Sequence, residues 1–308
     1  TTNWHDLEDS VRGATKRISS NEADAEATET NNFTAFNSDG FSVGTGPNVN
    51  GNTNSIVVWN WKAGTSVSGT TTGAGTNKSY TGSVNTTSGI SIIRYQGNGT
   101  NGHTIPHHLG VTPTVMMVKR LTTSSNWSNY QSDFWVSGGN QYIDLNRTAA
   151  AAADSVMWYN TQPTSSVFTV GTNERVNYNN DYFINYLFTP IQGYSSFGKY
   201  IGTNGGADGP FIYTGFKPAF VLIKDALAAN AWNIRDDKRN TYNPATNFLV
   251  PDSEAAEVTA GEAVDILSNG FKIKANGGKV QDSGNTYVYM AFAENPFVTS
   301  TGVPATAR

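Results

Sequence analysis

Two stretches of the sequence share one pattern at an offset of 105 positions. Residues 110–119 are GVTPTVMMVK and residues 215–224 are GFKPAFVLIK, so each places Gly, Pro and an apolar run closed by Lys in the same order. The register extends without an insertion to Trp127 and Trp232. Such self-similarity predicts tandem copies of one module of about a hundred residues.

The N-terminal segment carries the second half of a third copy. The stretch WHDLEDSVRG resembles WNIRDDKRN, NSDGFSVG resembles LSNGFKIK, and SIVVWNWKAG resembles TYVYMAFAEN. In this alignment Trp4 takes the place of Trp127 and Trp232. The strands that should precede Trp4 have no counterpart, so we expect a longer natural protein or another chain to supply them.

The residue content of the copies favours strands over helices. Gly, Asn, Thr and Ser are abundant, aromatic residues reach 12%, and charged residues are only 14%, a mixture typical of short strands joined by turns. The runs PTVMMVK and PAFVLIK each follow a Pro without a polar interruption, which predicts strands buried on both faces. The predicted fold class is all-β, with tandem β-sandwich modules: about two complete copies plus the N-terminal half copy.

The last strand of each copy alternates apolar and other residues instead. Side chains two positions apart share one face of a strand, so the larger residues of this strand should face a core. These nine positions are Val57, Trp59, Trp61, Ile184, Tyr186, Phe188, Val288, Met290 and Phe292.

The repeats divide the chain into four parts. Residues 1–64 form the incomplete repeat, residues 65–190 and 191–298 form β-sandwich modules, and residues 299–308 form a C-terminal tail. The Ser/Thr/Gly-rich stretch at residues 65–90 has two interpretations that composition does not separate: a flexible linker or polar edge strands.

Charge and motif content argue against several function classes. A net charge of −4 argues against nucleic-acid binding, which needs a basic face, and the absence of a long apolar run argues against membrane insertion. We find no phosphate-binding loop or hydrolase signature and predict no cofactor. His103, His107 and His108 cluster in HTIPHH, but the next copy has no His there, so we predict no metal site.

Charged residues recur at matching places in two copies. Asp237 and Arg239 follow Trp232 much as Asp9 and Arg12 follow Trp4. Paired carboxylates can perform acid and base catalysis, but repetition by module favours a structural ion pair. We therefore predict no catalytic residue.

An aromatic-rich stretch is the candidate ligand site. Trp135, Tyr130, Tyr142 and Asn129 lie close together in the sequence, and flat rings beside amide groups suit the apolar face and the hydroxyls of a sugar. The competing interpretation is packing in the core or between subunits. Trp127 recurs in the other copies and is expected in the core, whereas Trp135 does not recur and is the better candidate.

The combined motifs resemble a known class of repeat. YxGNG, GxxPxxxxxK, the single Trp, (S/N)xGF, YxYMAFAENPFV and the terminal TGVPATAR are similar to the repeat of virion surface and tail-fibre proteins of marine bacteriophages, including cyanobacterial viruses. The strand order more faintly resembles H-type lectin-like sandwiches. The resemblance implies a non-enzymatic homotrimer on the virion surface, with other virion proteins and a host-cell glycan as partners.

Alternatives to a tail-fibre or host-recognition role remain open at this point. The same family resemblance fits a capsid decoration or capsid-fibre protein, and lectin-like modules also fit a secreted adhesin. A polysaccharide-degrading spike would require two or three carboxylates in a groove.

Overall fold

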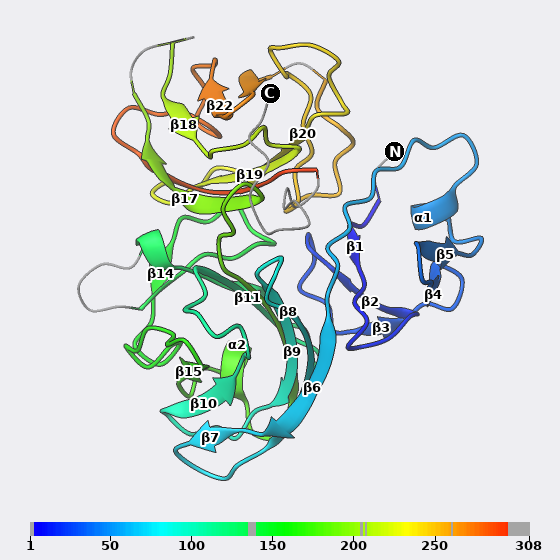
Figure 1. Ribbon diagram of the computed structural model, residues 1–308, viewed down its shortest axis with the longest axis vertical. Coiled ribbons are helices and arrows are strands. Elements are labelled where there is room, and N and C mark those ends of the chain that lie inside the picture. The colour runs from blue at the N-terminus through cyan, green and yellow to red at the C-terminus, as the bar shows by residue number, and fades with distance from the viewer. Residues whose placement is uncertain (1–2, 135–139, 204–205, 207, 260, 295–308) are drawn as a thin grey trace.

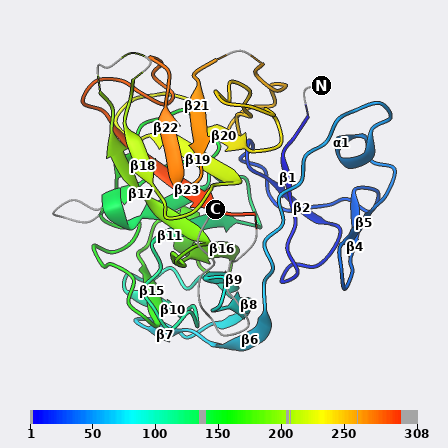
Figure 2. The same ribbon diagram turned by 45° about the horizontal axis from the view of Figure 1, so that its top comes forward.

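The computed structural model describes residues 3–134, 140–203, 206, 208–259 and 261–294. The predicted all-β sandwich class is confirmed. The only helices in the described ranges are the single turns α1 (Pro47–Asn50), α2 (Glu174–Asn177) and the 3₁₀ turn η1 (Ser132–Phe134). Figure 1 shows the three modules as three lobes, and Figure 2 shows the first module beside both of the others.

The second module (residues 65–190) contains two main sheets. The larger has the order β12-β11-β16-β9-β8-β6 and the smaller β15-β10-β7. Their bounds are β6 Thr65–Thr70, β7 Thr72–Gly73, β8 Ser79–Asn85, β9 Ile90–Gln96, β10 His103–Pro106, β11 Val115–Arg120, β12 Ser128–Gln131, β15 Val167–Val170 and β16 Tyr182–Phe188, and a short pair joins β13 Gln141–Tyr142 to β14 Ala152–Ala153.

The third module (residues 191–298) repeats part of this arrangement, with a larger sheet of four strands and a smaller sheet of three. Its sheets have the orders β17-β23-β19-β20 and β18-β22-β21. The bounds are β17 Ser195–Ile201, β18 Phe211–Tyr213, β19 Phe220–Asp225, β20 Asn233–Asp236, β21 Val264–Leu267, β22 Gly270–Ile273 and β23 Thr286–Phe292. Phe220 pairs with Phe292 as Val115 pairs with Phe188, so the alignment made from sequence matches the strand register.

The stretch at residues 65–90 is not a linker. It forms β6, β7, β8 and the start of β9, and β6 is the edge strand of the six-stranded sheet. The edge-strand interpretation is therefore the correct one. Most β6 side chains are exposed Ser, Thr or Gly, which is how polar composition and strand structure coexist at a sheet edge.

The first module (residues 1–64) has two small sheets. β1 (Asp6–Leu7), β2 (Lys16–Ser19) and β3 (Ala27–Thr28) form one, and β4 (Phe33–Phe36) and β5 (Phe41–Val43) form the other. The final segment, residues 54–64, aligns with β16 and β23 but carries no strand pairing in the described part of the chain.

Apolar side chains form two cores with different roles. One lies inside the second module and joins both of its sheets, for example Tyr95 and Phe183 with Phe168. The other fills the third module and continues between all three modules. β16 divides its side chains between them, because Phe183 and Leu187 enter the first core whereas Ile184 and Phe188 enter the second.

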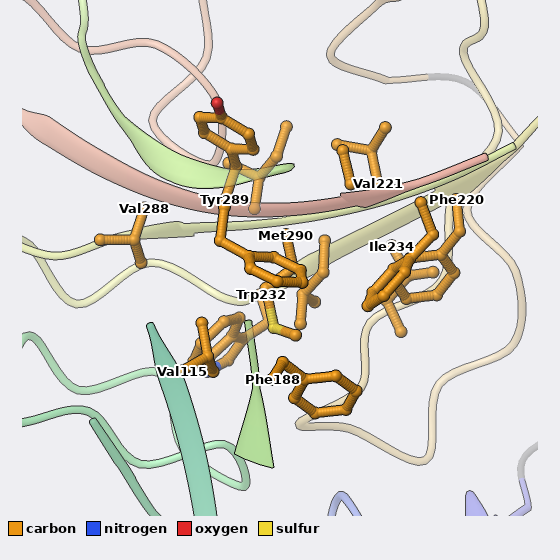
Figure 3. Packing of buried hydrophobic residues seen from close by; sticks show 14 of the residues in the cluster. Val115, Phe188, Phe220, Val221, Trp232, Ile234, Val288, Tyr289 and Met290 are labelled. Atoms are coloured by element: carbon orange, nitrogen blue, oxygen red, sulfur yellow. The ribbon is translucent and has the colours of Figure 1, made fainter. Parts of the chain in front are cut away.

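The alternating face predicted from sequence lies in the core between modules. Eight of its nine positions belong to that core or pack against it, and the exception is Val57, which is 38% exposed. Figure 3 shows Met290 pointing from β23 toward Phe188 and Trp232, with Tyr289 on the opposite side.

The ends of β16 and β23 meet the end of residues 54–64 at one aromatic cluster. Trp61 and Phe188 lie edge-on against Phe292, with ring centroids 5.3 and 5.8 Å apart. These residues occupy aligned positions of the three copies, so a common aromatic centre around Phe292 joins the three modules.

Candidate functional site

The Lys that closes each apolar run joins neighbouring modules. Lys119 Nζ donates to the Ala23 carbonyl of the first module at 2.8 Å, and Lys224 Nζ donates to the Thr148 carbonyl of the second at 3.0 Å. Both side chains are fully buried. Each ammonium also reaches carbonyls of the loop that follows its own strand, including Ser125 at 2.7 Å.

Burial affects the protonation of both amines. It lowers the pKa of Lys119 to about 7 and that of Lys224 to about 8, because the charged form loses hydration. Two carbonyl acceptors around Lys119 Nζ and four around Lys224 Nζ compensate for that loss. The sequence placed these two Lys residues at equivalent positions but gave no signal that they connect modules.

Tryptophan side chains make a second repeated link. Trp127 Nε1 donates to the Ser19 carbonyl and Trp232 Nε1 to the Asp144 carbonyl, both at 2.9 Å. Ser19 and Asp144 occupy equivalent positions, since Leu7 pairs with Ile18 in the first module as Asn129 pairs with Ile143 in the second.

The first module lacks the equivalent tryptophan, because His5 stands at that position. The backbone amide of His5 donates to Asn21 Oδ1 as that of Trp232 does to Asp252 Oδ1. The sequence alignment of Trp4 with Trp232 is therefore wrong by one residue. Trp4 is 40% exposed and lies against the Arg17 guanidinium.

The predicted ion pairs are half correct. Arg12 Nε lies 2.5 Å from Asp9 Oδ2, and both side chains are buried. Arg239 pairs with Asp236 Oδ2 at 2.8 Å, whereas Asp237 contacts Lys217 and Lys238. The same one-residue misalignment caused the error.

Both ion pairs contact the last segment of another module, which is β16 for Asp9 and residues 54–64 for Arg239. Asp9 Oδ2 accepts from the Tyr186 hydroxyl of β16 at 2.7 Å. The Arg239 guanidinium lies 5.8 Å from the Trp59 ring centroid. Oδ1 of Asp9 and Oδ1 of Asp236 each accept hydrogen bonds from two backbone amides of the following turn. These geometries favour a structural role over catalysis.

The predicted ligand-binding residues do not form one exposed surface. Tyr130 is 2% exposed and packs edge-on against Trp158, so its ring cannot stack on a sugar from solution. Asn129 is buried beside Trp232 at a void of about 20 Å³, which holds no more than one water molecule. Tyr142 is half-buried under Arg175, and Trp135 lies outside the described residues.

A polar end of the second module exposes two other tyrosines. Tyr178 and Tyr159 are 50% and 46% exposed and flank the turn at residues 98–102, where Gly99 approaches Asn179 and Gly102 approaches the Tyr159 ring. Tyr159 has a positive φ of 49°, a strained conformation for a non-Gly residue. We call this surface the tyrosine end.

A buried amide network supports the tyrosine end. Asn98 Nδ2 lies 2.8 Å from His103 Nδ1, and Asn177 Oδ1 accepts the Asn98 backbone amide at 2.9 Å. Burial lowers the pKa of His103. The sequence signal for this network is the YxGNG motif, which contains Asn98.

The described residues contain no group of three or more potential metal ligands. The histidines of HTIPHH have separate partners, because His107 Nε2 lies 3.1 Å from the Thr164 carbonyl and His108 Nε2 lies 2.9 Å from the Tyr80 hydroxyl. None of the described helices is sufficiently long and apolar to span a bilayer.

Fold and junctions define a multi-module β-sandwich protein whose modules are fixed to one another by buried polar links. Residues 1–296 match the family model described as domain of unknown function DUF7483, and the chain belongs to this family. No curated protein and no solved structure matches the chain.

Proposed function

We propose that this protein is a non-enzymatic component of a bacteriophage virion surface and that it acts in host recognition as part of a tail fibre. The repeat motifs carry the resemblance to such proteins. The observation that supports a display role best is the fixed arrangement of the modules, which buries Lys and Trp links at two junctions.

The tyrosine end is the host-facing surface in this proposal. The Tyr159 ring and the Tyr178 ring, which carries the Arg120 guanidinium over it, lie beside Asn179, Asn180 and Lys78. Their exposed parts offer stacking and hydrogen bonds, the combination that a cell-surface glycan requires. The surface stands on β9, β10 and β16 of a packed sandwich, so binding a ligand there requires little ordering of the protein.

The position of the chain on the particle tests the role. Cryo-electron microscopy of intact virions, labelled with antibody against this chain, should place it at the tail tip. Its absence from particles would contradict the whole proposal.

Capsid decoration is the second candidate. Three lobes around a common centre suit a threefold or quasi-threefold position of a capsid lattice. Label spread over the capsid would favour this role over host recognition. A secreted lectin-like adhesin would instead be found in culture medium free of particles.

Contact with host cells is tested with paired variants. We expect Tyr159→Ala with Tyr178→Ala to reduce binding to host cells about tenfold, which corresponds to about 1.4 kcal/mol for the lost ring contacts. Tyr242→Ala is the control, because Tyr242 is 84% exposed on the third module. Equal binding by both proteins would remove the tyrosine end from the proposal.

We also propose that chains associate with one another and with other virion proteins, as the resemblance implies. Light scattering checks the association, and a stable monomer at high concentration would contradict it.

A further inference from the structure

The last segment of the first module lacks the neighbours that its counterparts have. Residues 54–64 align with two central strands: β16 lies between β9 and β11, and β23 lies between β17 and β19. Among the described residues, no strand lies beside 54–64 in a sheet. In this described part of the chain, residues 54–61 therefore have no sheet partner on either side and carry backbone groups able to pair, whereas the Lys62 and Gly64 carbonyls accept hydrogen bonds from the Asn85 and Ser83 side chains.

An apolar run on this segment is exposed to solvent. Ile56, Val57 and Val58 are 45%, 38% and 49% exposed, whereas their counterparts at residues 287–289 are no more than 7% exposed. Consecutive β-branched residues suit a paired, covered strand. On both central strands, such residues are covered by the flanking strands and the sheet packed on them.

The junction next to this segment is also incomplete. Loops 19–26 and 144–151 each accept a buried Lys from the next module, through Ala23 and Thr148. The register places Glu254 of the third module at the equivalent position, since Leu249 pairs with Ile234 as Ile18 pairs with Leu7. Within the described ranges, no group donates to the Glu254 carbonyl.

We infer that residues 54–64 accept two strands of the repeat's own first-half type: a Tyr-x-Gly strand on one side and a Pro-led apolar strand ending in Lys on the other. These strands cover Ile56 to Val58, and the Lys ammonium reaches the Glu254 carbonyl. The interaction is strand addition to an open sheet position. It goes beyond the proposed virion role and does not depend on it.

The third module provides the probe, because residues 195–226 contain β17, β18 and β19. The sequence has no Cys, so one engineered pair reports register without interference. Ile223 pairs with Tyr289, and Val58 aligns with Tyr289. We expect the peptide of residues 195–226 with Ile223→Cys to form a disulfide with full-length Val58→Cys protein.

A control variant distinguishes in-register strand pairing from non-specific disulfide formation. Val57→Cys is comparably exposed but should be out of register with the same peptide. We expect its disulfide yield to be about tenfold lower, as a difference of about 1.4 kcal/mol gives. Equal yields would overturn the inference, as would preferential disulfide dimers of Val58→Cys protein in the presence of peptide.

The Lys contact has its own test. By calorimetry with the unmodified protein, the peptide with Lys224→Met should bind about tenfold more weakly than the natural peptide, because it cannot donate to the Glu254 carbonyl. The peptide with Lys217→Met is the control, since Lys217 precedes the strand. Equal affinities of all three peptides would remove the Lys from the inference, and no binding by any of them would overturn it.

Discussion

At the scale of single residues, Asp252 is the clearest departure from the repeat. Asn21, Asn146 and Asp252 all accept a backbone amide at equivalent places, but only the third is a carboxylate. Burial raises the pKa of Asp252 to about 6, and its Oδ2 is buried without a hydrogen-bond partner in the described structure.

The pH dependence of stability follows from that shift. The folded pKa of Asp252 exceeds its unfolded value of 3.8, so folding favours the protonated carboxyl. This contribution to stability is fully present below about pH 4 and is lost as the pH rises through about 6. We expect Asp252→Asn to raise the free energy of unfolding by about 1 to 2 kcal/mol at pH 8 and little at pH 4.

Urea denaturation at both pH values measures the effect. Asp39→Asn is the matched control, because Asp39 is exposed in the turn between β4 and β5, and it should change stability by less than about 0.5 kcal/mol. A pH-independent effect of Asp252→Asn would show that its carboxyl is not the cause.

At the scale of elements, the last strand of each module shows how far sequence patterns extend. The face that alternation selected on β16 and β23 is largely buried, but so is the opposite face of each strand. Alternation could not indicate that this face packs against other modules, because both faces of β23 are apolar and buried. It also failed at Val57, because burial there depends on strands that flank β16 and β23 but not residues 54–64.

The free energy of unfolding can be compared between a buried position, Phe292, and an exposed position, Val57. Phe292→Ala should lower the free energy of unfolding by about 3 to 5 kcal/mol, because its ring contacts Trp61, Phe188 and Phe220. Val57→Ala removes a side chain from the same alternating face and should cost less than about 1 kcal/mol. Thermal and urea unfolding test both, and similar losses would contradict the assignment of the centre.

At the scale of the whole molecule, sequence indicated the repeat and the sandwich class but not the junctions. Lys119 and Lys224 follow strong local strand signals, so their positions could be aligned. Their acceptors lie in loops of another module, 96 and 76 residues away in the chain, and no local pattern encodes that distance. The one-residue error at Trp4 had the same origin, since only pairing with β2 fixes the register.

The junction links should make the modules unfold together. We expect Lys224→Met to lower the free energy of unfolding by about 2 to 3 kcal/mol, because it leaves several buried carbonyls without a donor. Lys199→Met on the exposed face of β17 is the control and should change it by less than about 0.5 kcal/mol.

Calorimetry distinguishes the possible outcomes. The natural protein should show one transition, whereas Lys224→Met should broaden it or separate the third module from the rest. Equal behaviour of the Lys224 and Lys199 variants would contradict a linking role for the buried ammonium.

The common aromatic centre has a consequence for how such a protein can diversify. In a trimer of identical subunits, every mutation is repeated three times around the axis, so no site can change alone. Here the three equivalent positions are encoded separately, as Trp61, Phe188 and Phe292. Each lobe can therefore acquire its own surface by point mutation while the shared centre keeps the lobes together.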